Sequence, residues 1–214
     1  LAGLPVIWGI RNSDLSSRNS SRLTRAIVRL LGLFSAVIPK QIISCSTRAV
    51  DIHVALGYRR NLFAVVPNGF QLEKFKPSNA SRTAIRAELA VPPDALLVGS
   101  VARFDPQKNL LGLLDVAARV RQKLPTAHFV LAGAGVTRSN VEIASAIAGL
   151  PLSEGLHLLG KRTDVERIVA ALDVFVLPSI YGEGFPNVLG EAMACGVPCI
   201  TTDVGDSSFV VGPA

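Results

Sequence analysis

The sequence predicts an α/β protein whose larger part is a doubly wound parallel sheet. From about residue 80 onward, short continuous apolar runs alternate with segments of helical length, a pattern typical of parallel strands that are buried on both faces. Apolar residues make up 49% of the 214 residues and charged residues 18%, so the chain can form a sizeable core. The length is long for one domain and short for two large ones.

The first third of the chain predicts three strands separated by helices. Apolar runs indicate strands at residues 4–10, 41–46 and 62–66. Residues 23–37 predict a helix with Ile27 and Leu30 on one face and Arg25 and Arg29 on the other. An ordinary surface helix is the simpler interpretation of that pattern, and a basic face near an anionic membrane is the alternative. A second helix is expected at 48–56.

After an expected linker at residues 70–79, helices and strands alternate regularly. The strands are expected at 96–102, 129–132, 156–159, 174–177 and 199–202. The helices are expected at 81–89, 109–122, 141–148, 163–171 and 187–194. Thr163 and Glu166 have the spacing of a capping box at the start of one of these helices. Ligands bind beyond the carboxyl ends of the strands in such a sheet, so function is expected in the loops that follow them.

Charge and composition exclude several classes of protein. The net charge of +6 is uneven, because residues 1–77 hold 11 basic and 3 acidic side chains, and residues 78–214 hold 11 and 13. A protein that coats nucleic acid is therefore not expected. Three cysteines and three scattered histidines indicate neither a disulfide framework nor a zinc site. We expect a protein of a reducing compartment, and the first residue, Leu1, suggests a piece of something longer.

Two cations follow the first strand of the regular region. Arg103 and Lys108 lie five residues apart, between a strand end and a helix start. Arg can bind a phosphate through two N–H groups and Lys supplies a point charge, so this pair predicts an anion site. A solvated loop is an equally good interpretation of the spacing alone.

A pair of carboxylates follows the fourth strand of this region. Glu183 precedes the expected helix at 187–194 and Glu191 lies inside it. Backbone N–H groups near the start of a helix can face an anion, and here we expect those of Gly184, Phe185, Asn187 and Val188 to do so. Glu191 has apolar neighbours, so we expect it to be hidden rather than exposed. It could accept hydrogen bonds from two sugar hydroxyls.

Other nucleotide signatures are incomplete. Gly133-Ala134-Gly135 follows a strand, but Arg138 stands where a dinucleotide fingerprint has its third glycine. No phosphate-binding motif of the Walker type occurs. Gly160 and Lys161 follow a strand in a basic loop at the ligand end of the sheet.

Together these residues resemble the retaining glycosyltransferases of family 4, which have the GT-B architecture. Glu183 and Glu191 look like the family's pair of glutamates, and Arg103 with Lys108 looks like its grip on the donor diphosphate. Residues 65–70 with 75–77 are similar to its interdomain segment, and residues 197–205 to the strand after the glutamate motif. The resemblance covers most of the chain.

The resemblance implies transfer of a sugar from a UDP- or GDP-sugar to a glycan or lipid-linked acceptor, with retention of configuration, no metal and no cofactor. Glu183 would then contact and orient the donor sugar, and Glu191 would hold the ribose. Arg103 and Lys108 would bind the diphosphate; Gly184, Phe185, Asn187 and Val188 would bind phosphate and sugar. Gly160 and Lys161 would border the base. The parent would act in polysaccharide or glycolipid assembly, in the cytoplasm or at the inner membrane face.

The resemblance also implies two Rossmann-like domains, of which only one is nearly complete. Residues 1–77 would be the end of the acceptor-side domain plus the linker, and residues 78–214 the donor-binding domain without its closing helices. Exposed apolar surface is expected where the remainder would pack. Arg11-Asn12 stands where the family often has a histidine. The alternatives are a nucleotide-sugar epimerase on the same architecture and a binding module without transfer.

Overall fold

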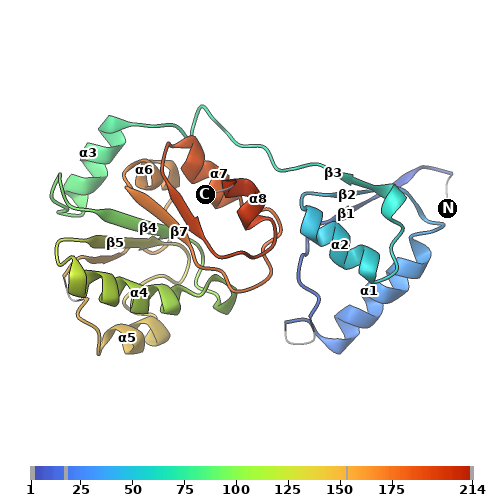
Figure 1. The fold of residues 1–214 in the computed structure, drawn as a ribbon, viewed down its shortest axis with the longest axis horizontal. Helices are drawn as coiled ribbons and strands as arrows, with labels where there is room; N and C mark the ends of the chain where they lie inside the picture. Colours follow the sequence, from blue (N-terminus) through green and yellow to red (C-terminus); the bar gives the residue numbers. More distant parts are fainter. Residues whose placement is uncertain (1–2, 17–18, 153, 213–214) are drawn as a thin grey trace. The chain divides into compact units, whose positions relative to one another are not determined.

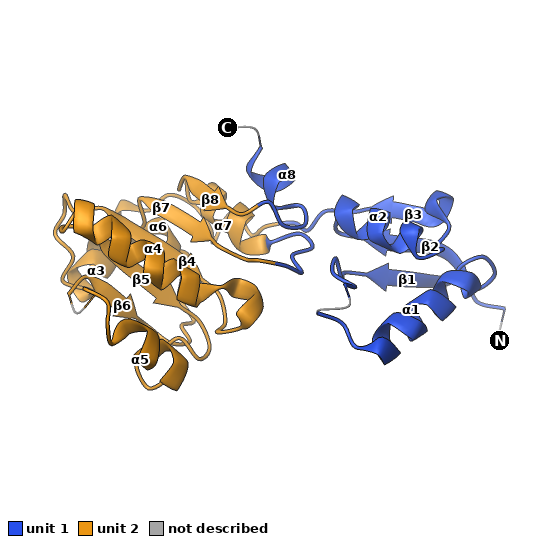
Figure 2. Cartoon of the chain, turned by 60° about the horizontal axis from the view of Figure 1, so that its bottom comes forward, with its two compact units in different colours: residues 1–69, 181–186, 203–214 blue, residues 70–180, 187–202 orange. Residues whose placement is uncertain are grey.

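The structure is a computed structural model that describes residues 3–16, 19–152 and 154–212. Its strands pair in parallel within two sheets, which confirms the predicted α/β class (Figure 1). The chain divides into two compact units (Figure 2). Unit 1 holds residues 1–69, 181–186 and 203–214, and unit 2 holds residues 70–180 and 187–202. This division differs from the expected boundary at residue 77, because segments from the second half of the chain belong to unit 1.

Unit 1 contains a three-stranded sheet in the order β1-β2-β3. Its strands are β1 (Val6–Ile10), β2 (Pro39–Ser44) and β3 (Phe63–Val65). Its helices are α1 (Arg22–Phe34), α2 (Thr47–Ala55), α8 (Ser207–Val211) and the short 3₁₀ turn η1 (Arg60–Leu62). The expected helix at 23–37 ends early, where the Ser35 hydroxyl donates to the Gly32 carbonyl at 2.6 Å. Helix α8 was not predicted from the sequence.

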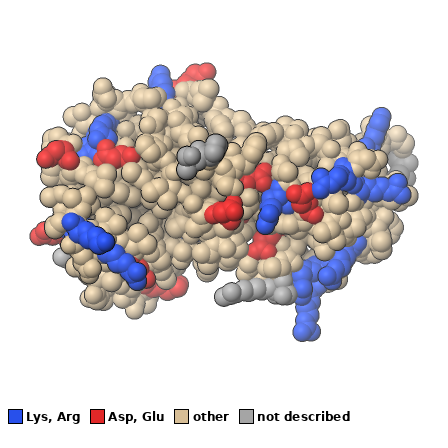
Figure 3. Space-filling model, in the orientation of Figure 1, with Lys and Arg blue, Asp and Glu red and all other residues tan. Residues whose placement is uncertain are grey.

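Unit 1 has a small core and a largely exposed apolar helix face. Ile42 and Ala49 are fully buried, and the ring of Tyr58 meets His53 edge-on with 5.1 Å between ring centres. On α1, by contrast, Leu23 is 70% exposed and Leu33 is 73% exposed. Figure 3 shows Lys and Arg side chains over the same unit.

Unit 2 contains a five-stranded sheet in the order β6-β5-β4-β7-β8. The strands are β4 (Leu97–Val101), β5 (His128–Ala132), β6 (Leu156–Leu158), β7 (Val174–Leu177) and β8 (Cys199–Thr201). The helices are α3 (Asn79–Glu88), η2 (Pro106–Lys108), α4 (Leu110–Lys123), α5 (Val141–Ile147), α6 (Val165–Ala170) and α7 (Asn187–Ala194). The chain starts at the central strand, runs to one edge and returns to the other, as predicted for a doubly wound sheet.

Helices cover both faces of this sheet (Figures 1 and 2). Leu114 of α4 and Ile143 of α5 pack with Phe129 and Leu131 of β5 in one buried cluster. On the other face α3 lies against α6. None of the helices in the described ranges is both long and apolar enough to cross a bilayer.

The capping box predicted at Thr163 and Glu166 is wrong. Helix α6 begins at Val165 and its N-cap residue, Asp164, makes no capping hydrogen bond through its side chain. The Asp164 carboxylate instead accepts hydrogen bonds from Arg162 at 2.8 Å. Glu166 pairs with Lys74 at 3.3 Å. Ion pairs with Arg162 and Lys74 therefore occupy the carboxylates near the start of this helix in place of a local cap.

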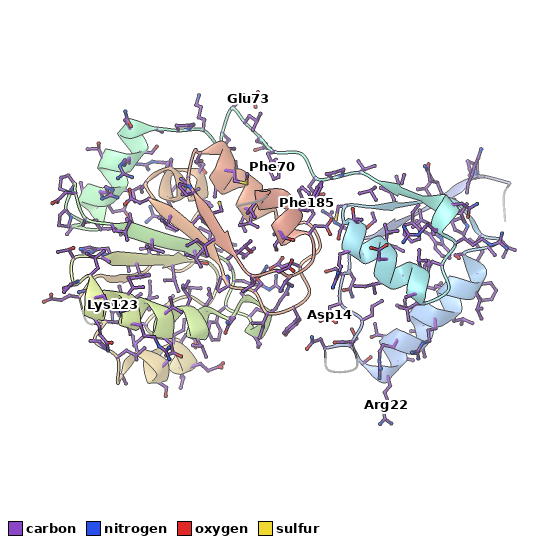
Figure 4. The ribbon with its side chains drawn as sticks, in the orientation of Figure 1. Asp14, Arg22, Phe70, Glu73, Lys123 and Phe185 are labelled. Atoms are coloured by element: carbon purple, nitrogen blue, oxygen red, sulfur yellow. The ribbon has the colours of Figure 1, made fainter. Side chains whose placement is uncertain are left out.

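The segment expected to be a linker packs onto unit 2. Phe75 is buried, with 7% of its surface exposed. The ring of Phe70 (labelled in Figure 4) lies against Gly190 in the middle of α7, and a Cβ at Gly190 would overlap that ring. Only glycine lets the ring approach the helix so closely. The segment thereby fixes one side of the helix that carries Glu191.

Candidate functional site

Four loops meet at the carboxyl edge of the sheet in unit 2, and we call them the carboxyl-edge loops (residues 103–108, 133–135, 160–162 and 178–180). Backbone hydrogen bonds join them in a row. The Gly133 N–H donates to the Gly160 carbonyl at 2.7 Å, and the Phe104 N–H donates to the Ala134 carbonyl at 2.8 Å. The Ile180 N–H donates to the Gln107 carbonyl at 3.0 Å. The loops that carry the predicted cations are thus joined to their neighbours by backbone hydrogen bonds along this edge of the sheet.

Arg103 and Lys108 lie on the first of these loops, which has a defined shape. Asp105 caps the turn η2 by accepting the Gln107 N–H at 2.9 Å. The Arg103 guanidinium is 59% exposed and lies 3.2 Å from the Asp105 carboxylate, a surface ion pair of small strength. Its N–H groups can therefore turn to an incoming anion. Lys108 is half-buried and ends the same turn.

Gly160 and Lys161 follow β6 at the same edge. Gly160 is buried and donates its N–H to the Val136 carbonyl at 2.8 Å, while Lys161 is exposed. Their neighbour Arg162 has a structural role, because it bridges the carboxylates of Glu88 and Asp164. Its guanidinium lowers the pKa of Asp164. Of the basic pair in this loop, Lys161 is the cation that faces solvent.

Glu191 lies on α7, whose first turn begins with Asn187 and Val188. The side chain is half-buried, as its apolar neighbours predicted. Burial raises the pKa of the Glu191 carboxyl, and the Lys74 ammonium acts in the opposite direction. A partly desolvated carboxylate favours hydrogen-bond donors such as hydroxyl groups. No sequence signal indicated Lys74.

Glu183, Gly184 and Phe185 belong to unit 1, apart from the other predicted residues. Glu183 is 6% exposed. Its carbonyl accepts a hydrogen bond from the Ser13 hydroxyl. A Cβ at Gly184 would lie 3.0 Å from the Arg11 carbonyl oxygen. Arg11 itself donates to the Asn68 side chain at 3.2 Å. Ser13 and Arg11 lie more than a hundred positions away in sequence from this loop, and local patterns could not find their contacts.

Among the described residues, neither an apolar pocket nor the side chains that could bind a metal ion form a competing site. A pocket of about 300 Å³ lies between α4 and strands β7 and β8, but residues such as Leu113, Val116 and Ile200 line it, and they supply no charge for a diphosphate. Within the described ranges, no group of three or more His, Cys, Asp or Glu side chains could hold a metal ion.

Comparison with known proteins decides the family. The sequence profile of the family described as "Glycosyl transferases group 1" matches residues 93–213, more than half of the chain. The chain belongs to the group 1 glycosyltransferases. This confirms the resemblance drawn from Arg103, Lys108, Glu183 and Glu191, and it gives no support to the epimerase alternative.

Relatives of this glycosyltransferase chain are enzymes and proteins of glycan assembly. It is 28% identical over 99% of its length to "UDP-Gal:alpha-D-GlcNAc-diphosphoundecaprenol alpha-1,3-galactosyltransferase" of Escherichia coli, and covers 55% of that protein. It is 34% identical over 99% of its length to the "Vi polysaccharide biosynthesis protein VipC/TviE" of Salmonella typhi, and covers 37% of it. The chain thus spans about half the length of such relatives, or less.

Solved structures show the same fold. Anabaena Alr3699/HepE in complex with UDP matches with a TM-score of 0.86 and 26% identity, over 98% of this chain and 56% of that one. The same protein in complex with UDP-glucose matches with a TM-score of 0.83. These neighbours are GT-B glycosyltransferases, so the predicted fold class is confirmed.

Proposed function

We propose that the intact protein containing this chain transfers a sugar from a nucleotide-sugar to a glycan or lipid-linked acceptor. The observation that carries the proposal is the carboxyl edge of unit 2, where hydrogen bonds join the loops of Arg103 and Lys108 to the other edge loops in a chain of this family. The UDP-glucose complex of a solved neighbour favours a UDP-sugar over a GDP-sugar.

Each site residue has a proposed role. Arg103 and Lys108 bind the diphosphate and stabilise the negative charge that develops on it as the sugar leaves. Two cations in this place make a metal unnecessary for that task. Glu191 accepts the ribose hydroxyls, and Gly160 with Lys161 borders the base. N–H groups of Gly184, Phe185, Asn187 and Val188 bind phosphate and sugar.

Glu183 is the proposed catalytic residue, which contacts and orients the donor sugar. Glu183 is 6% exposed, and its carboxylate oxygens can accept hydrogen bonds from sugar hydroxyls. We propose that transfer retains the configuration of the donor. NMR of the first-formed product would show this directly, since the anomeric coupling of the product distinguishes retention from inversion.

We also propose a cytoplasmic location, peripheral at the inner membrane face. The support is α1, where exposed Leu23 and Leu33 lie on the same helix as Arg22, Arg25 and Arg29. Such a helix binds anionic lipid through both apolar burial and charge. Sedimentation with vesicles of anionic and of neutral lipid tests the proposal, which requires binding to the anionic vesicles only.

Calorimetry on the intact protein tests the donor site. UDP should bind, and the double variant Arg103→Ala/Lys108→Ala should weaken UDP by roughly 10- to 100-fold while changing uridine affinity little, because charge-assisted hydrogen bonds to phosphate are lost. Glu191→Ala should weaken UDP and uridine alike. Lys123→Ala is the matched control. Lys123 is the last residue of α4 (Figure 4), whereas Lys108 lies just before the start of this helix, so the control removes a lysine from the other end of α4. Equal losses of affinity for UDP and for uridine in the double variant would contradict the assignment of Arg103 and Lys108 to the diphosphate.

A further inference from the structure

Asp206 is a buried carboxylate to which neither the sequence motifs nor the proposed function gives a role. It is 5% exposed and lies directly before α8, in unit 1. Its carboxylate accepts three hydrogen bonds from the start of α2: from the Ser46 hydroxyl at 3.0 Å, the Thr47 N–H at 2.7 Å and the Arg48 N–H at 2.9 Å. A carboxylate at a helix start is stabilised by these free N–H groups and by the helix dipole.

The backbone around Asp206 holds the loop that contains Glu183. The Asp206 N–H donates to the Gly184 carbonyl at 3.0 Å. Gly205, with a φ of +62°, packs so closely on the Glu183 carbonyl that a Cβ there would overlap it. The same carbonyl accepts the Ser13 hydroxyl. Both carbonyls at the Glu183–Gly184 step are therefore fixed, one of them by the residue whose side chain is bound to α2.

We propose that Asp206 is a positioning residue for Glu183. Its side chain fastens residues 203–211 to the first turn of α2, and its backbone transmits this constraint to the Glu183 loop. The inference rests on the proposed function, in which Glu183 orients the donor sugar. The proposed diphosphate contacts of Arg103 and Lys108 and the ribose contact of Glu191 lie in unit 2, and of the proposed phosphate and sugar contacts only Glu183 and the N–H groups of Gly184 and Phe185 lie in unit 1. Losing the Asp206 carboxylate should therefore affect sugar orientation much more than nucleotide binding.

Kinetics with a UDP-sugar donor test this on the intact protein. Asp206→Ala should lower kcat roughly 10- to 100-fold, the effect expected when a reacting group is displaced by about 1 Å, while the calorimetric Kd for UDP changes by less than about threefold. Asp206→Asn keeps one acceptor oxygen and should recover part of the loss. Asp203→Asn is the matched control, because Asp203 is an exposed carboxylate of the same segment and accepts a hydrogen bond from the Ser208 hydroxyl at 2.8 Å.

Hydrogen exchange gives a readout that does not depend on the reaction. In Asp206→Ala the amides of residues 181–186 should exchange faster than in the parent protein, and in Asp203→Asn they should not. Ser46→Ala removes a partner from the opposite side and should act in the same direction, which keeps the test usable if Asp206→Ala does not fold. An unchanged kcat and unchanged exchange in Asp206→Ala would overturn the inference. A parent protein that binds no nucleotide-sugar would instead overturn the proposed function.

Discussion

Ala90 and Asn109 stand out at the residue scale, because both have a positive φ without being glycine. Their φ values are +52° and +48°. Asn109 suits this left-handed conformation, which short polar side chains tolerate. It follows Lys108 and precedes α4, so it sets the direction in which the chain leaves the loop of residues 103–108. Ala90 does not suit it. It lies just after α3, whose last residue is Glu88 and whose C-cap is Leu89, a place where glycine is favoured.

Ala90→Gly should therefore stabilise the protein. Replacement removes the strain of a left-handed alanine, which is about 1 kcal/mol, and Ala90 is exposed, so little packing is lost. The free energy of unfolding in urea measures the change. Asn109→Gly is the control, with little expected gain because asparagine already tolerates the conformation. A loss of stability in Ala90→Gly would contradict this account.

Single residues differ in how far their surroundings can be predicted. The burial of Glu191 follows from its apolar neighbours in sequence, since a helix places them around it. The contacts of Glu183 do not, because Ser13 and Gly205 reach it from the two ends of the chain. The local sequence pattern determines which side chains of a helix are buried. It contains no information about which distant loop packs against them.

At the scale of elements, Asp173 ties α3, β4 and β7 together. Its carboxylate accepts from Arg82 at 2.6 Å, from Arg86 at 2.5 Å and from the Leu97 N–H at 2.7 Å. Burial acts to raise the pKa of Asp173, but the Leu97 hydrogen bond and the two guanidinium groups outweigh it and lower the pKa. No periodicity in the sequence links α3 to the residue before β7, so this network was not predicted.

Removing Asp173 should cost much more than removing an exposed partner. Asp173→Ala leaves Arg86, whose side chain is 5% exposed, without its carboxylate, and breaking such a buried pair costs about 3 kcal/mol or more. Asp51→Ala removes a pair with Arg60 in which both side chains are more than half exposed, and should cost less than about 1 kcal/mol. Urea unfolding of both variants compares them. Similar losses of unfolding free energy in the two variants would show that the Asp173 network stabilises the protein no more than an exposed ion pair does.

At the scale of the whole chain, the parallel sheet of unit 2 was predictable and the division into units was not. Continuous apolar runs predicted the parallel sheet of unit 2, because strands buried on both faces need apolar side chains throughout. The expected boundary at residue 77 came instead from the resemblance to the family's interdomain segment and from the change in charge balance there. The structure instead assigns residues 181–186 and 203–214 to unit 1. Hydrogen bonds of Asp206 with the start of α2, and of Ser13 with the Glu183 carbonyl, join these segments to residues 1–69, and composition does not record such contacts.

The stability of the chain should fall in mild acid because of two histidines in the sheet of unit 2. His128 Nδ1 and His157 Nε2 lie 3.1 Å apart, and their rings are stacked at 5.4 Å between centres. Burial, then repulsion from His128, Arg138 and Arg121, lowers the pKa of His157 from 6.5 to about 4. The unfolded chain, with an ordinary histidine, therefore binds more protons than the folded chain between these values.

The stabilisation from a neutral His157 is complete above about pH 6.5 and is lost as the pH falls toward about 4. Urea midpoints measured at about pH 7.5 and about pH 5 should differ more in the parent protein than in His157→Gln, which has no proton to gain in that range. The comparison between the two proteins removes the contribution of carboxylates such as Asp173, which both contain. Equal pH dependence in the two would mean that the stacked pair takes up a proton in the folded state as easily as in the unfolded one.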